Sequence, residues 1–143
     1  MKPASYQIDL PKNSQAVLFV NGIKAENITG CLWLWRQIIG IKKANLVSEG
    51  CKQVKLGICN YREAVIVSYW QDEASLMAFF HSPIHRKMMQ KMTSFLVGHP
   101  QAISIYNEMY RPLRSGRYYQ NPHGLALIYP ASPSHSEQKA IVS

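Results

Sequence analysis

Residues 64–90 read AVIVSYWQDEASLMAFFHSPIHRKMMQ, and this stretch decides the fold. Its first part, Ala64 to Trp70, is rich in β-branched and aromatic residues, which is typical of a central strand. Asp72 can cap a short helix that ends near the Ser82-Pro83 pair. Serine as an N-cap and proline in the first turn then start a second helix, which should end near Gly98. The stretch therefore predicts one strand followed by two consecutive helices.

The residues before this stretch predict a strand and a long helix. The apolar run at 16–21 indicates a buried strand, and Asn21-Gly22 after it indicates a turn. Residues 28–43 follow a helical period, and Lys42-Lys43 suit the negative end of the helix dipole. The apolar stripe of this helix is expected at Ile28, Leu32, Trp35 and Ile39, and Cys31, Leu34 and Ile38 widen it.

The remaining segments complete an α+β pattern. Residues 54–59 alternate in polarity and should form an antiparallel hairpin with the strand at 64–70. Residues 102–110 alternate again and supply the last strand. The order is then strand, helix, strand, strand, helix, strand, which predicts a ferredoxin-like βαββαβ sheet with its helices on one face.

Such a sheet leaves its second face uncovered. Four aromatic residues of the two strongest strands are expected there: Tyr69, Trp70, Tyr106 and Tyr110. Monomers rarely expose an apolar patch of that size. We therefore expect a homodimer in which two sheets pair face to face, which is a dimeric α+β barrel.

The chain of 143 residues is long enough for one ordinary domain. Residues 1–14 are expected to form an extended arm, 15–130 the single domain, and 131–143 a disordered tail. The N-terminus lacks the apolar core of a signal peptide, and no stretch approaches the length of a membrane span. These features predict a soluble, cytoplasmic protein.

The chain is basic, with 16 Lys and Arg against 8 Asp and Glu. Such an excess can attract nucleic acid, anionic lipid or an acidic substrate. The positive residues are scattered and no RNA-binding motif is present, which disfavours nucleic acid. Peripheral contact with a membrane through the tryptophan-rich helix and Lys42-Lys43 is a further alternative. The chain has no nucleotide-binding, serine-hydrolase or zinc-peptidase motif.

Two segments carry a family resemblance. Residues 64–90 resemble the strand-then-helix signature of the dimeric α+β barrel superfamily, in which "YW", a capping acid, "L..F" and "SP.H" follow in order. The run SIYNEMYRPLRSGRYYQNPHGLAL at 104–127 is similar to the C-terminal half of a monooxygenase-like family within it. The match covers about residues 16–128.

The resemblance implies a pocket between the helices and the sheet of each subunit. The superfamily includes cofactor-free quinone-forming monooxygenases and several haem enzymes, and haem-dependent carotenoid ketolases are similar in outline. It thus implies a monooxygenase-like enzyme that acts on an apolar small molecule, with haem as one candidate cofactor. Because one fold serves many reactions, the resemblance does not choose among them.

One position departs from that family. Asn107 stands before Glu108 where the family has histidine, and an amide neither shuttles protons near neutral pH nor ligates haem well. If that histidine is catalytic, this chain has lost or rewired the step. If it is structural, Asn107 keeps much of its hydrogen bonding. A non-catalytic protein that binds a small ligand on the same fold is therefore the alternative.

Three residues are candidates for catalysis. His85 lies one turn into the second helix, where neutral imidazole is a general base and, in haem-binding relatives, the iron ligand. The alternative for His85 is a surface position. Glu108 interrupts an apolar strand, so it is expected either to pair with Arg111 or Arg114 or to point to solvent or the dimer edge. Asn107 is the third.

Ligand-binding candidates are mostly aromatic or methionine residues. Tryptophan in the first helix and third strand would line a flat apolar pocket for a ring-bearing or polyene ligand, with core packing as the alternative. Methionines of the second helical region would form a soft wall or fill the core. The candidates are Trp33, Trp35, Tyr69, Trp70, His81, Met88, Met89 and Tyr106.

Overall fold

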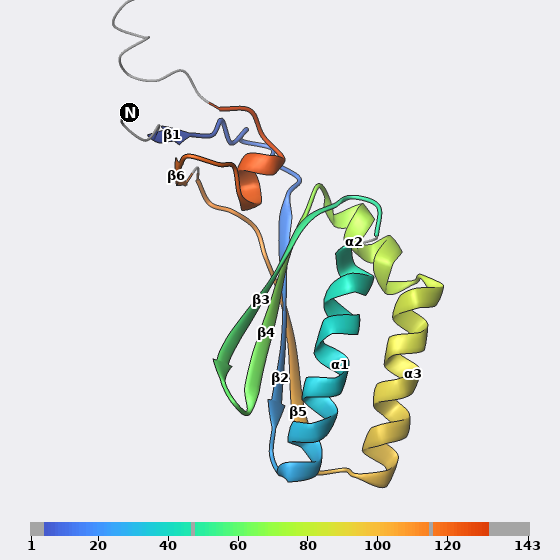
Figure 1. Ribbon diagram of the computed structural model, residues 1–143. Helices are drawn as coiled ribbons and strands as arrows, with labels where there is room; N and C mark the ends of the chain where they lie inside the picture. Colours follow the sequence, from blue (N-terminus) through green and yellow to red (C-terminus); the bar gives the residue numbers. More distant parts are fainter. Residues whose placement is uncertain (1–4, 47, 115, 132–143) are drawn as a thin grey trace, which may run out of the picture.

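The computed structural model describes residues 5–46, 48–114 and 116–131 (Figure 1). The elements in chain order are β1 (Ser5–Gln7), β2 (Val17–Ala25), α1 (Ile28–Leu46), β3 (Cys51–Asn60), β4 (Glu63–Trp70), α2 (Glu73–Phe80), α3 (Pro83–Gly98), β5 (Ile103–Tyr110), β6 (Arg117–Tyr119) and the 3-10 turn η1 (Gly124–Leu127). Residues 1–4 and 132–143 lie outside the described residues, and with them the start of the predicted arm and most of the predicted tail.

The main sheet has four antiparallel strands in the order β3-β4-β2-β5. Figure 1 shows α1 and α3 side by side on one face of this sheet, with α2 at one end. The predicted ferredoxin-like α+β fold is confirmed. β1 and β6 form a separate antiparallel pair beyond the end of the sheet.

Local signals in the sequence set the ends of the helices. The Asp72 side chain accepts a hydrogen bond of 2.7 Å from the backbone N–H of Ser75 and caps α2. The Ser82 hydroxyl accepts one of 3.2 Å from the N–H of His85 and caps α3. Both caps satisfy donors that the first helical turn leaves unpaired. The break between the two helices is therefore encoded in residues 72–83.

The predicted turn at Asn21-Gly22 is wrong, because β2 continues through it to Ala25. Gly22 pairs with Tyr106 on β5, and a Cβ atom at Gly22 would overlap the Tyr106 ring. The glycine therefore makes room for an aromatic ring that crosses the strand. An Asn-Gly pair therefore indicates a hairpin only where no side chain of a neighbouring strand packs over the glycine.

The apolar stripe predicted for α1 is correct only in the residues that widen it, because its four central residues face solvent. Leu34 and Ile38 are the residues that pack on the sheet, with Gly30 beside them. The stripe of Ile28, Leu32, Trp35 and Ile39 lies on another side of the helix and is exposed. Because α1 has two apolar faces, its periodicity alone does not identify the buried one.

Trp70 faces the helices, which corrects its expected place on the open face. It lies on the same face of β4 as Ala64, Ile66 and Ser68, all of which are buried. Its indole N–H donates a 2.8 Å hydrogen bond to the Ser68 hydroxyl, and its ring lies 5.4 Å from that of Phe79. Trp70 is therefore part of the core between β4 and α2.

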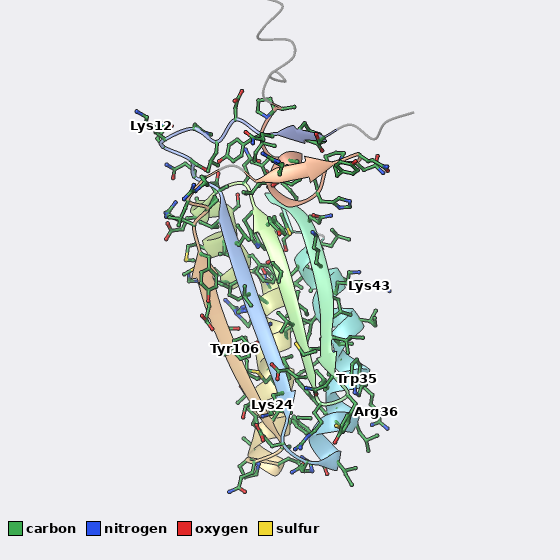
Figure 2. All side chains as sticks on the ribbon, turned by 90° about the vertical axis from the view of Figure 1, so that its left-hand side faces the viewer. Lys12, Lys24, Trp35, Arg36, Lys43 and Tyr106 are labelled. Carbon is green, nitrogen blue, oxygen red and sulfur yellow. The ribbon has the colours of Figure 1, made fainter. Side chains whose placement is uncertain are left out.

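The opposite face of the sheet is turned toward the viewer in Figure 2, where Tyr106 lies on it. Its apolar side chains are half-buried or exposed: Leu18, Val20, Val65, Val67, Tyr69, Tyr106 and Tyr110. Leu18 and Tyr69 are covered at one end by a small cluster around Ile8, Ala16 and Leu125. The chain thus covers one end of this face and leaves the rest open.

Gly30 should not tolerate even alanine. Its Cβ would overlap the backbone carbonyl of Ala102, which cannot move aside as a side chain can. We expect Gly30→Ala to lower the free energy of unfolding by about 2 kcal/mol or more, measured by urea denaturation. Gly40→Ala in the same helix meets no atom within 4 Å and should raise it by roughly 1 kcal/mol. Equal effects at both positions would contradict this close approach of α1 to the sheet.

Candidate functional site

A cavity of about 290 Å³ lies between the sheet and the helices α1 and α3. Its apolar walls come from both layers and include Phe19, Ile23, Trp33, Phe79, Met88 and Met92. Its polar groups are four carboxamides and three basic side chains: Asn21, Gln37, Asn45, Asn107, His85, Lys87 and Lys91. An apolar hollow with a few polar groups is the usual form of a small-molecule site.

His85 is placed by the Ser82 cap in the first turn of α3. Its ring lies 5.1 Å from the ring of Phe79 and 5.3 Å from that of Phe80. Burial lowers the pKa of His85; a hydrogen bond with the Phe80 backbone opposes this, and the charge of His81 adds to it. The imidazole is therefore neutral near pH 7, which leaves one ring nitrogen able to accept a proton.

Two of the carboxamides carry unpaired oxygens. Asn45 is 2% exposed, and its amide nitrogen donates a 2.8 Å hydrogen bond to the carbonyl of Ile41. The side-chain oxygens of Asn45 and Asn21 are both buried without a hydrogen-bond partner among the described residues. A buried acceptor without a donor costs about 1–3 kcal/mol. Both oxygens therefore suit a ligand that brings hydroxyl or N–H groups into the cavity.

The strands place two amides opposite each other. Asn21 on β2 pairs in register with Asn107 on β5, and both side chains line the cavity. Asn107, the residue that replaces the family's histidine, therefore lies in the cavity next to a second amide. The two asparagines can orient a polar group of a ligand, while neither can take up a proton near neutral pH.

The structure brings five of the predicted site residues to the cavity: Trp33, His85, Met88, Met89 and Asn107. Three separate segments contribute them: α1 carries Trp33, α3 carries His85, Met88 and Met89, and β5 carries Asn107. Trp33 also stacks on Phe95 at 4.9 Å between ring centroids, which fixes the wall of the cavity between α1 and α3.

The other predicted residues lie elsewhere, because strand alternation or helix geometry turns them away. Trp35 is on the exposed side of α1, where its indole N–H donates to the carbonyl of Tyr61 at 2.9 Å. His81 is the exposed residue that ends α2. Trp70 fills the core beside the cavity, without lining it.

Three more lie on the open face of the sheet. Tyr69 packs against Gly124, and Tyr106 covers Gly22. Glu108 is exposed and accepts a hydrogen bond from the Tyr110 hydroxyl. The expected pairing of Glu108 with Arg111 is wrong, because Arg111 forms an ion pair of 2.6 Å with Glu73. Glu108 therefore points to solvent, which is the alternative expected for it from the sequence.

The sequence reading missed Asn21, Gln37 and Asn45. The sequence pattern predicts a strand that ends at Asn21, whereas β2 continues past it, and alternation with Phe19 and Ile23 places Asn21 on the helix-facing side. A polar residue in line with the helix-facing residues of a strand is the feature of the sequence that indicates a cavity-lining position. Asn45 lay beyond the predicted end of the helix at 43, so its place in the core was not foreseen.

Haem does not fit the cavity as the chain forms it. The volume lies near the lower limit of roughly 300–1,000 Å³ for small-molecule pockets, which suits two or three fused rings and not a tetrapyrrole. Among the residues that the structure describes, His85 is the one imidazole that lines it, and its ring contacts those of Phe79 and Phe80. Among the described residues, no group of three or more His, Cys, Asp or Glu could hold a metal ion.

The fold and this cavity together define an α+β subunit of the ferredoxin-like type that can enclose a small molecule beneath its helices. The chain belongs to the monooxygenase af470-like family, whose model matches residues 17–123. A search of the curated proteins finds no match to the sequence. The resemblance to haem-dependent carotenoid ketolases stays a prediction.

Several solved structures share the fold. A protein from Shewanella oneidensis superposes with a TM-score of 0.56 at 14% identity, over 73% of this chain and 94% of its own. A Pseudomonas aeruginosa protein gives 0.55 at 14% identity, over 72% and 99%. SnoaB, a cofactor-independent oxygenase from Streptomyces nogalater, gives 0.50 at 10% identity, over 70% and 95%. At such identities the likeness shows the fold alone.

Replacing Asn21 by valine should stabilise the empty protein. The change removes a buried acceptor that has no partner and puts a β-branched residue into a central strand. We expect the free energy of unfolding to rise by about 1 kcal/mol in urea denaturation. Asn107→Val, across the ladder at an exposed position, should change it by less than about 0.5 kcal/mol. Destabilisation by Asn21→Val would mean that this oxygen is satisfied in the folded chain.

Proposed function

We propose that this protein is a monooxygenase-like enzyme that oxidises a hydroxylated, otherwise apolar ring compound inside the cavity under α1 and α3. The observation that carries this proposal is the pairing of apolar walls with two unpaired buried amide oxygens and a neutral histidine. Membership of a monooxygenase-like family supports the reaction class. The size of the cavity supports a ligand of two or three fused rings.

His85 is proposed as the general base. A phenolic hydroxyl placed beside its free ring nitrogen loses its proton to the imidazole, which leaves an electron-rich ring. The low dielectric of the surrounding aromatic rings keeps water from competing for that proton. The imidazole later returns the proton as water is formed.

The electron-rich ring can then react with O₂ directly. One carbon–oxygen bond forms at a ring CH, the oxygen–oxygen bond breaks, and the second oxygen leaves as water with the hydroxyl and ring hydrogens. The substrate supplies the electrons and becomes a quinone, so no separate reductant is required. In this scheme Asn21 and Asn45 accept hydrogen bonds from further hydroxyls and hold the ring, and Asn107 donates to the developing carbonyl oxygen.

The proposal is tested by oxygen uptake with a hydroxyanthrone and a dihydroxynaphthalene as probes. Wild-type protein should consume one O₂ per quinone formed, faster than the uncatalysed reaction. Ala44→Trp, which places a large side chain on the cavity wall, should abolish the acceleration while the circular dichroism spectrum stays unchanged. Uptake that continues unchanged in Ala44→Trp would place the reaction outside the cavity and contradict the proposal.

A binding protein without turnover is the second candidate. Among residues 5–46, 48–114 and 116–131, no carboxylate lines the cavity, and Asn107 replaces the family's histidine. His85 is then the single group there that titrates near neutral pH. Tight binding of the same probes, with no oxygen uptake at any pH between about 5 and 9, would favour this candidate over the enzyme.

We further propose that two copies of the chain pair through the open face of the sheet. Its exposed parts include Tyr106 and Tyr110, and residues of the segments 6–16 and 118–129 cover the other end. Two such faces in contact would bury the aromatic rings and shield each other from water. Sedimentation should therefore give a dimer that Tyr106→Glu converts to monomer. A wild-type monomer at high concentration would contradict this arrangement.

A further inference from the structure

Helix α1 presents a second apolar face to solvent. Ile28 is 80% exposed, Leu32 57% and Ile39 53%, and Trp35 and Leu46 are exposed beside them. The spacings of four, three, four and seven residues place all five on one side of the helix. This is the stripe that the sequence predicts as buried, and it points away from the sheet on which Leu34 and Ile38 pack. We call these five residues the outer stripe of α1.

Positive charge flanks the outer stripe on α1 and continues on the neighbouring helix α3. α1 carries Arg36, Lys42 and Lys43, and α3 carries Arg86, Lys87 and Lys91, while neither helix contains Asp or Glu. Within the described part of the chain, the ion pair that the structure contains joins Arg111 to Glu73 and involves none of these six. Figure 2 shows Trp35, Arg36 and Lys43 along the outer edge of α1. The helical layer is therefore cationic and apolar at once.

We infer that the helical layer docks on an anionic membrane surface, with the outer stripe of α1 in the interface and the cations at the headgroups. A helix that lies in a membrane interface combines Trp, Leu and Ile on one side with Lys and Arg on the other. The net charge of +8 adds long-range attraction to anionic lipid. Nucleic acid would use the cations and leave Ile28, Leu32 and Ile39 in water, so lipid fits the whole surface better. Within the described residues, no helix is long and apolar enough to cross a membrane.

The cavity opens on the same layer. A groove between α1 and α3 shares Trp33, Gln37, Lys87 and Lys91 with the cavity. Trp33 and Gln37 lie on the side of α1 opposite the outer stripe, so docking leaves this groove open to solvent and accessible to the substrate of the proposed reaction. This last step rests on the proposed function, whereas membrane binding does not. The sheet face proposed for the dimer lies on the other side of the molecule and stays free.

The experiment measures binding of the full chain to vesicles of phosphatidylcholine, with and without phosphatidylglycerol, by cosedimentation. Leu32→Ser/Ile39→Ser removes apolar contact from the outer stripe, and Arg36→Gln/Lys43→Gln removes two charges beside it. The matched controls are Leu113→Ser, at a 96% exposed leucine, and Lys12→Gln/Lys24→Gln, which removes the same charge elsewhere. Figure 2 shows Lys12 and Lys24 away from the outer edge of α1.

Wild-type protein should bind anionic vesicles and not neutral ones. The stripe variant should bind at least about tenfold more weakly and the charge variant roughly thirtyfold, while both controls bind as wild type does. The Trp35 fluorescence should shift to the blue on binding, and Trp35→Phe should remove the shift.

Several results would overturn the inference. One is that the wild type does not bind anionic vesicles at low ionic strength. A second is that the control variants lose as much vesicle affinity as the stripe and charge variants. A third is that the protein binds nucleic acid more tightly than vesicles and that the stripe variant keeps this binding. A change of oligomeric state in the stripe variant, without vesicle binding by the wild type, would instead make the outer stripe a contact between copies. Because none of these readouts uses turnover, a failed oxygen assay leaves this test unaffected.

Discussion

Trp70→Ala should lower the free energy of unfolding by about 3–5 kcal/mol. The indole is fully buried between β4 and α2, in contact with Phe79 and hydrogen-bonded to Ser68. Alanine would leave a large cavity there and would free the Ser68 hydroxyl from its donor, and both effects destabilise the fold. Urea denaturation followed by circular dichroism measures the change.

Trp35→Ala is the matched control for Trp70→Ala. The same atoms are removed, but Trp35 lies on the exposed side of α1 and its loss opens no cavity. The variant loses the hydrogen bond from the indole to the Tyr61 carbonyl, which is worth about 0.5–1.5 kcal/mol, together with the contacts of the covered part of a residue that is 38% exposed. A loss as large as that in Trp70→Ala would contradict the assignment of Trp35 to the solvent side.

His85→Ala should lower turnover by about two to four orders of magnitude if His85 is the general base. The control is His81→Ala, because His81 is exposed at the end of α2 and does not line the cavity. It should leave turnover within about threefold of wild type, since it touches no reacting group. Oxygen uptake with the probe substrates measures both. Equal rates for His85→Ala and wild type would remove His85 from the reaction.

The pH profile separates a base from a merely structural residue. Burial lowers the pKa of His85, so the folded protein keeps this imidazole neutral below the ordinary value of about 6.5. Turnover should therefore stay level as pH falls to about 6.5, and should drop only at lower pH, where the ring takes up a proton. His85→Ala should abolish this acid limb. If the limb persists in the variant, another group is responsible for it.

The sequence could predict the parts of the fold that depend on local signals. The caps at Asp72 and Ser82, the hairpin before Trp70 and the order of strands and helices along the chain all rest on residues that act on their neighbours in the chain. The orientation of α1 does not, because Ile28, Leu32, Trp35 and Ile39 form as regular a stripe as the face that is buried. Contacts between elements settle which face packs, such as that of Gly30 with Ala102 just before β5 and those of Leu34 and Ile38 in the core.

The candidate site was predictable in part for the same reason. His85 and Trp33 could be named from residue type and element, whereas Asn21 required the parity of β2 on the helix-facing side. A predicted turn at Asn21-Gly22 ends the strand there, so it does not indicate which face of the sheet Asn21 occupies. Glu108 was noticed because it interrupts apolar residues, yet alternation alone turns it to solvent. Parity along a strand is thus a better guide than residue type.

Two faces of one subunit emerge with different chemistry. The open face of the sheet is aromatic and lies on the opposite side from α1 and α3, which suits a second copy of the chain. The helical layer combines the outer stripe of α1 with cations, which suits lipid. Pairing through the open sheet face would leave the helical layer of each chain on the outside of the dimer.

The most direct test is native mass spectrometry of the protein purified from its own cells, wild type beside Asn21→Val. If the cavity under α1 and α3 binds the proposed ligand, each wild-type chain should carry one small molecule, with an accurate mass that corresponds to an unsaturated, hydroxylated compound. Asn21→Val should lose it, because the variant lacks the amide oxygen that accepts the hydroxyl. Wild-type protein that carries no such compound, or a variant that retains it undiminished, would contradict a binding site at this place.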